Sequence, residues 1–162
     1  MIDPERELAA PPDLPEPPDD AAGEPLVADI MSRRLVAVRS DVDLMVAVDV
    51  FLRHAVRHLL VVDPDRTFRG LLSAEHVLAA IATTGGGRPS VGAHVGGRPP
   101  RVRRDATVRE AAEVMLAELV DALPVVDHDG RVVGLVTWTD IVALVAGHHL
   151  GARRVTPARR VR

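Results

Sequence analysis

The sequence predicts an α/β domain built from two copies of one β-α-β-β-α unit. The first observation is an internal repeat: sliding the 162-residue chain over itself by 64 residues places Gly70 on Gly134, and "LLVVDPDRTFRGLLSAEHV" then lies on "LPVVDHDGRVVGLVTWTDI" without a gap. The second is Asp129-Gly130 between two β-branched runs, a pairing that predicts a hairpin. The third is the change to helical apolar spacing in "TDIVALVAG", directly after the last strand.

Each unit is expected to begin with a short strand, "LVAV" in the first copy and "PRV" in the second, followed by a turn with an acid. An amphipathic helix follows over 43–55 and 107–119, and then a hairpin and a second helix. One face of each amphipathic helix is expected to be buried, with these residues: Leu44, Val48, Phe51 and Leu52 in the first copy, and Val108, Ala112, Met115 and Leu116 in the second. A unit of about 55 residues is small for independent stability, so we expect the two units to pack into one domain.

Composition predicts five segments along the chain. Residues 1–25 hold seven of the thirteen prolines and eight acids, a composition typical of a disordered acidic tail. Residues 26–84 form the first repeat, 85–90 a glycine-rich linker and 91–147 the second repeat. Residues 148–162 are expected to form a basic C-terminal tail, which carries five arginines.

The sequence also excludes several classes of protein. It has no cysteine, which rules out disulfides, thiolate nucleophiles and zinc or iron–sulfur sites built on cysteine. "MIDPERELAA" lacks the basic start and apolar core of a signal peptide, and no apolar run is long enough to span a bilayer. We therefore expect a soluble, cytoplasmic protein without membrane contact. Because the chain starts at Met1 with a disordered leader, we also expect it to be free-standing.

The pattern resembles the CBS domains, which occur in tandem pairs called Bateman modules. The resemblance is carried by Leu123-Pro124-Val125-Val126-Asp127, by Gly130, and by Gly134-Leu135-Val136-Thr137-x-x-Asp140-Ile141, together with the duplication. It covers roughly residues 26–147. It implies two CBS repeats packed about a pseudo-two-fold axis, with no catalysis of their own.

The resemblance further implies a regulatory module that binds an adenine nucleotide or adenosyl ligand (AMP, ADP, ATP or S-adenosylmethionine) and relays its occupancy by a conformational or dimer change. No cofactor is required, a homodimer is expected, and the downstream target is unknown. In that family the Thr/Ser and Asp of the G-h-h-[ST]-x-x-D motif contact ribose and phosphate. The implied ligand-binding residues are Thr137, Asp140, Pro100, Arg101, Val102, Ala122, Leu123 and Pro124, with Ser73 in the first repeat.

The physical chemistry of these residues agrees with that implication. A carboxylate accepts hydrogen bonds from sugar hydroxyls, and the helix N-terminus beside it offers free N–H groups to a phosphate. Four arginines near the first strand of the second repeat could add positive charge: Arg98, Arg101, Arg103 and Arg104.

Thr137 and Asp140 also have a purely structural interpretation as a helix capping box, and the sequence leaves both roles open. In the first repeat Ser73 lies on Thr137 but His76 lies on Asp140, and an imidazole does not reproduce a carboxylate's paired acceptors. We therefore expect the second repeat to hold the main site and the first to be weak or altered.

Other candidates are weaker. His54 and His58 stand at i, i+4 without a third ligand, so no metal site is predicted, and no nucleophile-elbow pattern supports a catalytic residue. The arginine tail lacks aromatic residues, so nucleic acid binding is not expected. Two alternatives stay open: a ligand-free scaffold that dimerises, and a regulatory fragment of a larger enzyme.

Overall fold

A computed structural model describes residues 23–83, 87–97 and 99–148, and it contains two copies of the predicted unit. The first copy comprises β1 (Ala37–Arg39), α2 (Leu44–His54), β2 (His58–Val62), β3 (Phe68–Ser73) and α3 (Ala74–Thr83). The second comprises β4 (Val102–Arg103), α4 (Val108–Glu118), β5 (Ala122–Val126), β6 (Val132–Thr137) and α5 (Trp138–Val145). Two short helices precede the copies, α1 (Val27–Ile30) and the 3-10 helix η1 (Val91–His94).

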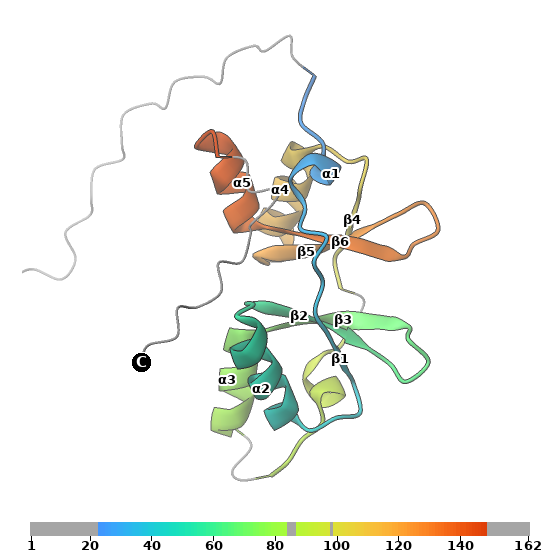
Figure 1. Cartoon of the computed structure of the whole chain (residues 1–162), viewed down its shortest axis with the longest axis vertical. Helices are drawn as coiled ribbons and strands as arrows, with labels where there is room; N and C mark the ends of the chain where they lie inside the picture. Colours follow the sequence, from blue (N-terminus) through green and yellow to red (C-terminus); the bar gives the residue numbers. More distant parts are fainter. Residues whose placement is uncertain (1–22, 84–86, 98, 149–162) are drawn as a thin grey trace, which may run out of the picture.

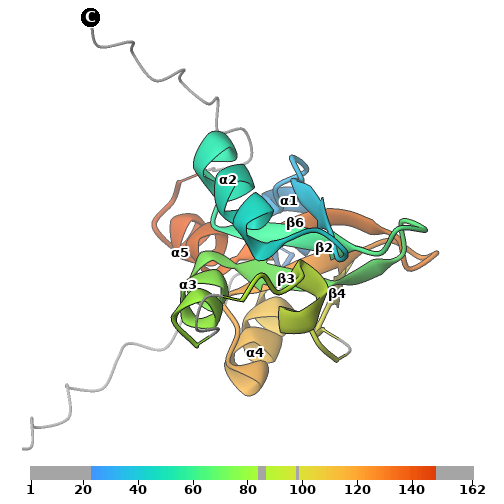
Figure 2. The ribbon, with the colours of Figure 1, turned by 90° about the horizontal axis from the view of Figure 1, so that it is seen from below.

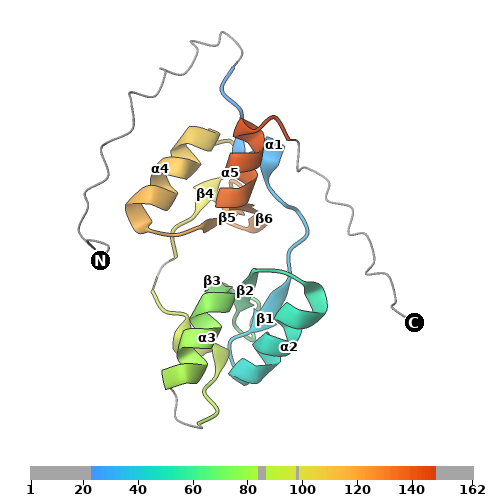
Figure 3. The same cartoon turned by 90° about the vertical axis from the view of Figure 1, so that its left-hand side faces the viewer.

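Each unit forms its own three-stranded sheet, in the orders β1-β2-β3 and β4-β5-β6. The first pair of strands is parallel and the hairpin pair is antiparallel in both sheets. The two sheets lie toward the middle of the molecule, and the helix pairs α2–α3 and α4–α5 lie toward its two ends (Figures 1 and 3). Both hairpin turns extend to the same side (Figure 2), which places the starts of β2 and β5 together on the opposite side.

The hairpin turn of the second unit is built as the sequence predicts. The Asp127 carboxylate accepts the N–H groups of Asp129 and Arg131 at 3.0 and 2.9 Å. Gly130 has φ +78°, a backbone conformation that a side chain disfavours. Asp127 and Gly130 therefore both favour this turn, although the first unit makes the equivalent turn with Arg66 at φ +70°.

The predicted helix faces were only partly right. Leu44, Phe51, Val108 and Met115 are buried, whereas Leu52 is 77% and Leu116 64% exposed. Ala47 and Ala111, each one residue before a predicted position, are fully buried instead. The physical reason is that the buried face of each helix is narrow. Alanines fill part of this face, and the two leucines lie outside its edge.

The two units exchange their leading segments, which the sequence analysis did not predict. The N–H of Val27 donates to Ala106 and that of Ala28 to Arg104, both in the second unit. Equivalent bonds join the segment before the second unit to the first, from Val91 to Val42 and from Gly92 to Ser40. Each segment then crosses to its own unit, so the connections run between the halves (Figure 1).

Two glycines make room for the exchanged segments. A Cβ on Gly134 of β6 would overlap the side chain of Met31, and one on Gly70 of β3 would overlap Val95. Val91 and Val95 consequently belong to the first hydrophobic core, and Val27 and Met31 to the second. The glycines that align in the repeat are thus explained by the close approach of a crossing segment.

Candidate functional site

The predicted site lies where β6 passes into α5. The hydroxyl of Thr137 accepts the N–H of Asp140 at 3.4 Å, and the Asp140 carboxylate accepts the N–H and the hydroxyl of Thr137 at 2.8 and 2.7 Å. These bonds form a capping box, so the structural interpretation of the motif is correct.

The capping box uses only one oxygen of the Asp140 carboxylate. Both bonds from Thr137 end on Oδ2, and Oδ1 accepts no hydrogen bond within the described part of the chain. The carboxylate is only partly buried, so Oδ1 can accept a hydrogen bond from a bound molecule while Oδ2 continues to cap the helix. Capping and ligand binding are therefore compatible at the same time.

The structure brings Ala122, Leu123 and Pro124 beside this junction. Ala122 pairs with Thr137, and Leu123 with Val136, in the β5–β6 ladder. All three side chains are buried, as is that of Val102 on β4. These four residues can therefore offer a ligand only their backbone groups.

Pro124 changes the backbone of the second unit in a specific way. In the first unit the N–H of Leu60 donates to the carbonyl of Val36 at 2.9 Å. The equivalent residues are Pro124 and Pro100, and proline has no N–H to donate. The carbonyl of Pro100 thus lacks this bond, and β4 is one residue shorter than β1.

The arginines near β4 have different surroundings. Arg103 donates to both oxygens of Asp105 at 2.9 Å and lowers the pKa of that carboxyl to about 2. The Arg103 guanidinium also lies 2.7 Å from Nδ1 of His128, so its donors are already used by neighbouring side chains. Arg101 and Arg104 are exposed and have no side-chain partner among the residues described, and Arg98 lies outside that part.

Ser73 occupies the equivalent junction in the first unit. Its hydroxyl accepts the N–H of His76 at 3.2 Å, so the helix is capped there as well. The side chain of His76 is exposed and returns no bond to Ser73. The first unit therefore keeps the cap and lacks the carboxylate.

The two junctions meet through His58 and Asp121, a contact that the sequence analysis missed. Nε2 of His58 lies 3.0 Å from Oδ1 of Asp121, with side-chain exposures of 6% and 64%. His58 starts β2 and pairs with Ser73, while Asp121 directly precedes β5. The repeat alignment contained a signal for it, since Arg57-His58 lies on Asp121-Ala122 with opposite charge.

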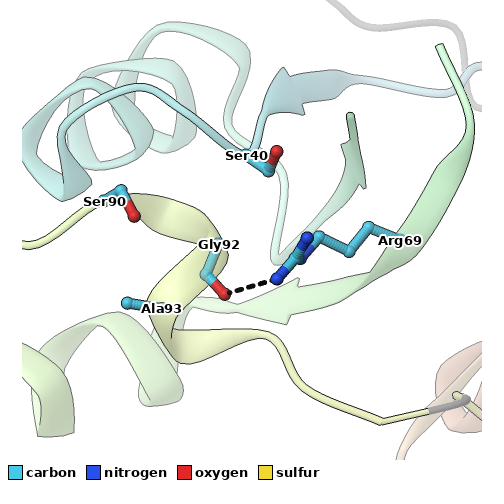
Figure 4. A pocket seen from close by; sticks show the side chains of 5 residues that line it. All are labelled: Ser40, Arg69, Ser90, Gly92 and Ala93. Carbon is cyan, nitrogen blue, oxygen red and sulfur yellow. Dashed lines mark hydrogen bonds between the residues drawn. The ribbon is translucent and has the colours of Figure 1, made fainter. Parts of the chain in front are cut away.

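A separate pocket of about 370 Å³ lies beside η1 (Figure 4). It is lined by Ser40, Arg69, Ser90, Gly92 and Ala93. Asp63 already accepts the Ser40 hydroxyl at 2.5 Å and Arg69 at 3.2 Å, and Arg69 also donates to the carbonyl of Gly92. Its principal polar groups are thus paired with one another, and the pocket is distinct from the predicted site.

The described residues contain no group of three or more His, Asp or Glu side chains that could hold a metal ion. Among the helices in the same ranges, none has the length and apolar character needed to cross a membrane.

Comparison with known proteins identifies the repeated unit. A family model described as CBS domain matches residues 27–83 and 94–147, which confirms the predicted resemblance and the α/β fold. A CBS domain pair in complex with 5′-methylthioadenosine and S-adenosyl-L-methionine is 27% identical, with a TM-score of 0.70 over 76% of this chain and 98% of that one. CBSX2 in complex with AMP is 28% identical, with a TM-score of 0.65 over 76% and 97%.

Longer curated relatives contain the same segment. A homoserine O-acetyltransferase from Methanohalobium evestigatum is 30% identical over 119 residues, which are 74% of this chain and 24% of that protein. The chain thus spans about a quarter of the length of the first such relatives.

Proposed function

Since the chain belongs to the CBS domain family, we propose that it is a regulatory module whose second repeat binds an adenine nucleotide or adenosyl ligand. The Oδ1 of Asp140 carries this proposal: it accepts no hydrogen bond from the residues that the structure describes, and a partly buried carboxylate oxygen suits a sugar hydroxyl. One similar structure contains AMP and another contains S-adenosylmethionine and methylthioadenosine, and all three ligands share an adenosine group.

The carbonyl of Pro100 supports an adenine-binding position in the same repeat. Because Pro124 supplies no N–H, this carbonyl can accept a hydrogen bond from the exocyclic amino group of adenine. The corresponding carbonyl of Val36 in the first repeat already accepts the N–H of Leu60. The same difference favours the second repeat over the first, where His76 also replaces the carboxylate.

The relay of occupancy is proposed to use the crossing segments. Pro100 and Arg101 precede β4, and the same segment continues back to Val95, which packs in the core of the first repeat. A ligand held at Pro100 therefore favours the relative arrangement of the two repeats that it binds more tightly.

The acetyl transfer named for longer relatives is not assigned to this chain, which matches about a quarter of their length and contains the CBS domains.

The outer helices favour self-association as a second element of the proposal. They leave large apolar side chains exposed at both ends of the molecule, among them Leu52 and Leu78, Leu116 and Leu119, and Val142 and Val145. Exposed apolar side chains of this kind are typical of interfaces, and they suit a homodimer or the ligand-free scaffold alternative.

We expect a Leu119→Asp, Val145→Asp double variant to sediment as a monomer under conditions where the parent dimerises. A parent that is monomeric at every concentration would contradict self-association.

The proposed function is tested by thermal denaturation of the full chain with AMP, ADP, ATP, S-adenosylmethionine and methylthioadenosine, with UMP as control. A ligand at 100 times its dissociation constant stabilises the folded state by about 2.7 kcal/mol. We expect at least one adenine compound to raise the melting temperature while UMP does not. If no adenine compound at millimolar concentration raised the melting temperature, ligand binding would be contradicted and the ligand-free scaffold would be favoured.

A further inference from the structure

The pocket beside η1 is built from side chains that the second repeat does not have. Its lining residues come from the end of β1, the start of β3 and the segment that leads into the second repeat (Figure 4). The shift of 64 residues places other side chains at three of these positions: Arg104 for Ser40, Val133 for Arg69 and Leu26 for Ser90. Since the second repeat folds without this set, folding alone does not account for it.

Asp63 supports the pocket and differs in role from its counterpart in the second repeat. That counterpart, Asp127, accepts two N–H groups of the hairpin turn. In the first repeat Asp65 accepts a turn N–H at 2.9 Å instead. The carboxylate of Asp63 accepts the Ser40 hydroxyl at 2.5 Å and the Arg69 guanidinium at 3.2 Å. Asp63 therefore fixes the two polar side chains of the pocket rather than the turn.

Arg69 is held in place and still has donors for a bound molecule. One Nη donates to Asp63 and the other to the carbonyl of Gly92, toward which the side chain reaches in Figure 4. The remaining N–H groups of the guanidinium have no partner among the residues described. The Ser90 hydroxyl makes no capping bond to η1 and can donate as well. Among the described lining residues Arg69 is the single charged one, so the pocket favours an anion.

The Ser40 hydroxyl selects among anions. Ser40 is only 7% exposed, and because the carboxylate of Asp63 accepts hydrogen bonds and cannot donate them, the hydroxyl gives its proton to Asp63. The Ser40 oxygen then offers the pocket lone pairs alone. An anion that carries a proton can donate to this oxygen, whereas an anion without a proton is repelled by it. Inorganic phosphate retains a proton at neutral pH, and sulfate has none.

We infer that this pocket binds a phosphate group that retains a proton, with its negative oxygens at Arg69 and Ser90 and its hydroxyl at Ser40. The three acids that adjoin the pocket each form an ion pair with an arginine: Asp41 with Arg39, Asp43 with Arg88 and Asp63 with Arg69. The phosphate joins β3 of the first repeat to the segment that leads into the second, so it strengthens the docking of that segment. The inference does not rest on the proposed function, because the adenine site lies elsewhere.

Titration calorimetry of the full chain with inorganic phosphate and with sulfate tests the inference. We expect phosphate to bind and sulfate to bind about tenfold more weakly or not at all, because sulfate offers no donor to the Ser40 oxygen. Melting temperatures alone would not suffice, since both ions also stabilise proteins by exclusion from their surface. Glycerol phosphate at a pH of about 6, where a monoester keeps part of its protons, distinguishes the source. Binding of inorganic phosphate alone identifies the free ion, and comparable binding of both identifies a phosphate monoester.

Two variants locate the phosphate. Arg69→Gln should weaken phosphate binding by about ten- to a hundredfold, the effect of losing a charge-assisted hydrogen bond. Arg53→Gln, the same change in an arginine that pairs with an aspartate on α2 of the same repeat, is the matched control and should not alter it. Ser40→Ala should lower the affinity for phosphate and leave that for sulfate unchanged, so the preference between the two ions is lost. Neither Arg69→Gln nor Ser40→Ala should change the binding of adenosine.

Three results would overturn the inference. The first is equal binding of phosphate and sulfate by the parent, and the second is phosphate binding that survives Arg69→Gln. The third is the absence of measurable phosphate binding at millimolar concentration, whatever the adenine compounds do. Because the comparison of the two ions uses the parent protein, it remains decisive even if a variant fails to fold.

Discussion

Asp140→Asn is expected to weaken adenine nucleotide binding by about 1.5 to 3 kcal/mol, or roughly ten- to a hundredfold, because it replaces a charged acceptor with a neutral amide. The stability of the unliganded protein should barely change. Asparagine keeps one carbonyl oxygen, which can accept the N–H and hydroxyl of Thr137 as Oδ2 does now. The amide nitrogen then takes the place of Oδ1 and offers a donor where the ligand needs an acceptor. Titration calorimetry and thermal denaturation of the same preparation measure both quantities.

Thr137→Ala separates capping from binding. It removes the hydroxyl that accepts the N–H of Asp140, so we expect a loss of about 1 kcal/mol of stability whatever the function is. Affinity should fall as well only if the junction holds the ligand. The binding role of Asp140 would be wrong if Asp140→Asn bound every responding nucleotide as tightly as the parent while its stability fell.

The sequence predicted the fold well because the signals behind it are local and duplicated. The strand-to-helix junctions and the α/β class follow from apolar spacing, which recurs at equivalent places in the two copies. The Asp-Gly turn marks the second hairpin alone, since the first has Asp65-Arg66 there. The exposure of Leu52 and Leu116 shows the limit of this approach, since periodicity alone does not give the width of a buried face.

Contacts between the two repeats could not be predicted in the same way. The His58–Asp121 contact and the docking of Val27 on the second repeat both join residues far apart in the chain. The spacing of apolar residues within a single helix or strand does not indicate such contacts. Gly70 and Gly134 were visible in the alignment, but the reason for them is a segment that crosses from the other unit. The motif at Thr137 and Asp140 likewise predicted two roles. Only the geometry showed that one carboxylate oxygen serves the cap while the other accepts no bond from the described residues.

The exchange of leading segments makes a strong prediction for Val27 and Val91, which are both fully buried. Val27→Asp is expected to destabilise the second repeat, although residue 27 precedes the first repeat in the sequence. Val91→Asp should destabilise the first repeat. An unpaired charge at such a buried position costs about 3 to 5 kcal/mol, a large part of the stability of an ordinary domain.

Hydrogen–deuterium exchange of the full chain locates the damage. With Val27→Asp the amides of β5 and β6 should lose protection before those of β2 and β3, and with Val91→Asp the order should reverse. Val46→Asp, at a position that is 42% exposed in the first turn of α2, is the control for the same substitution and should leave both patterns unchanged. The physical reason is that hydrogen bonds from Val27 to Ala106 and from Val91 to Val42 attach each segment to the core of the other repeat. Loss of protection in β2 and β3 first with Val27→Asp would mean that each segment docks on its own repeat, and coupling of the repeats through exchanged segments would then have no structural basis.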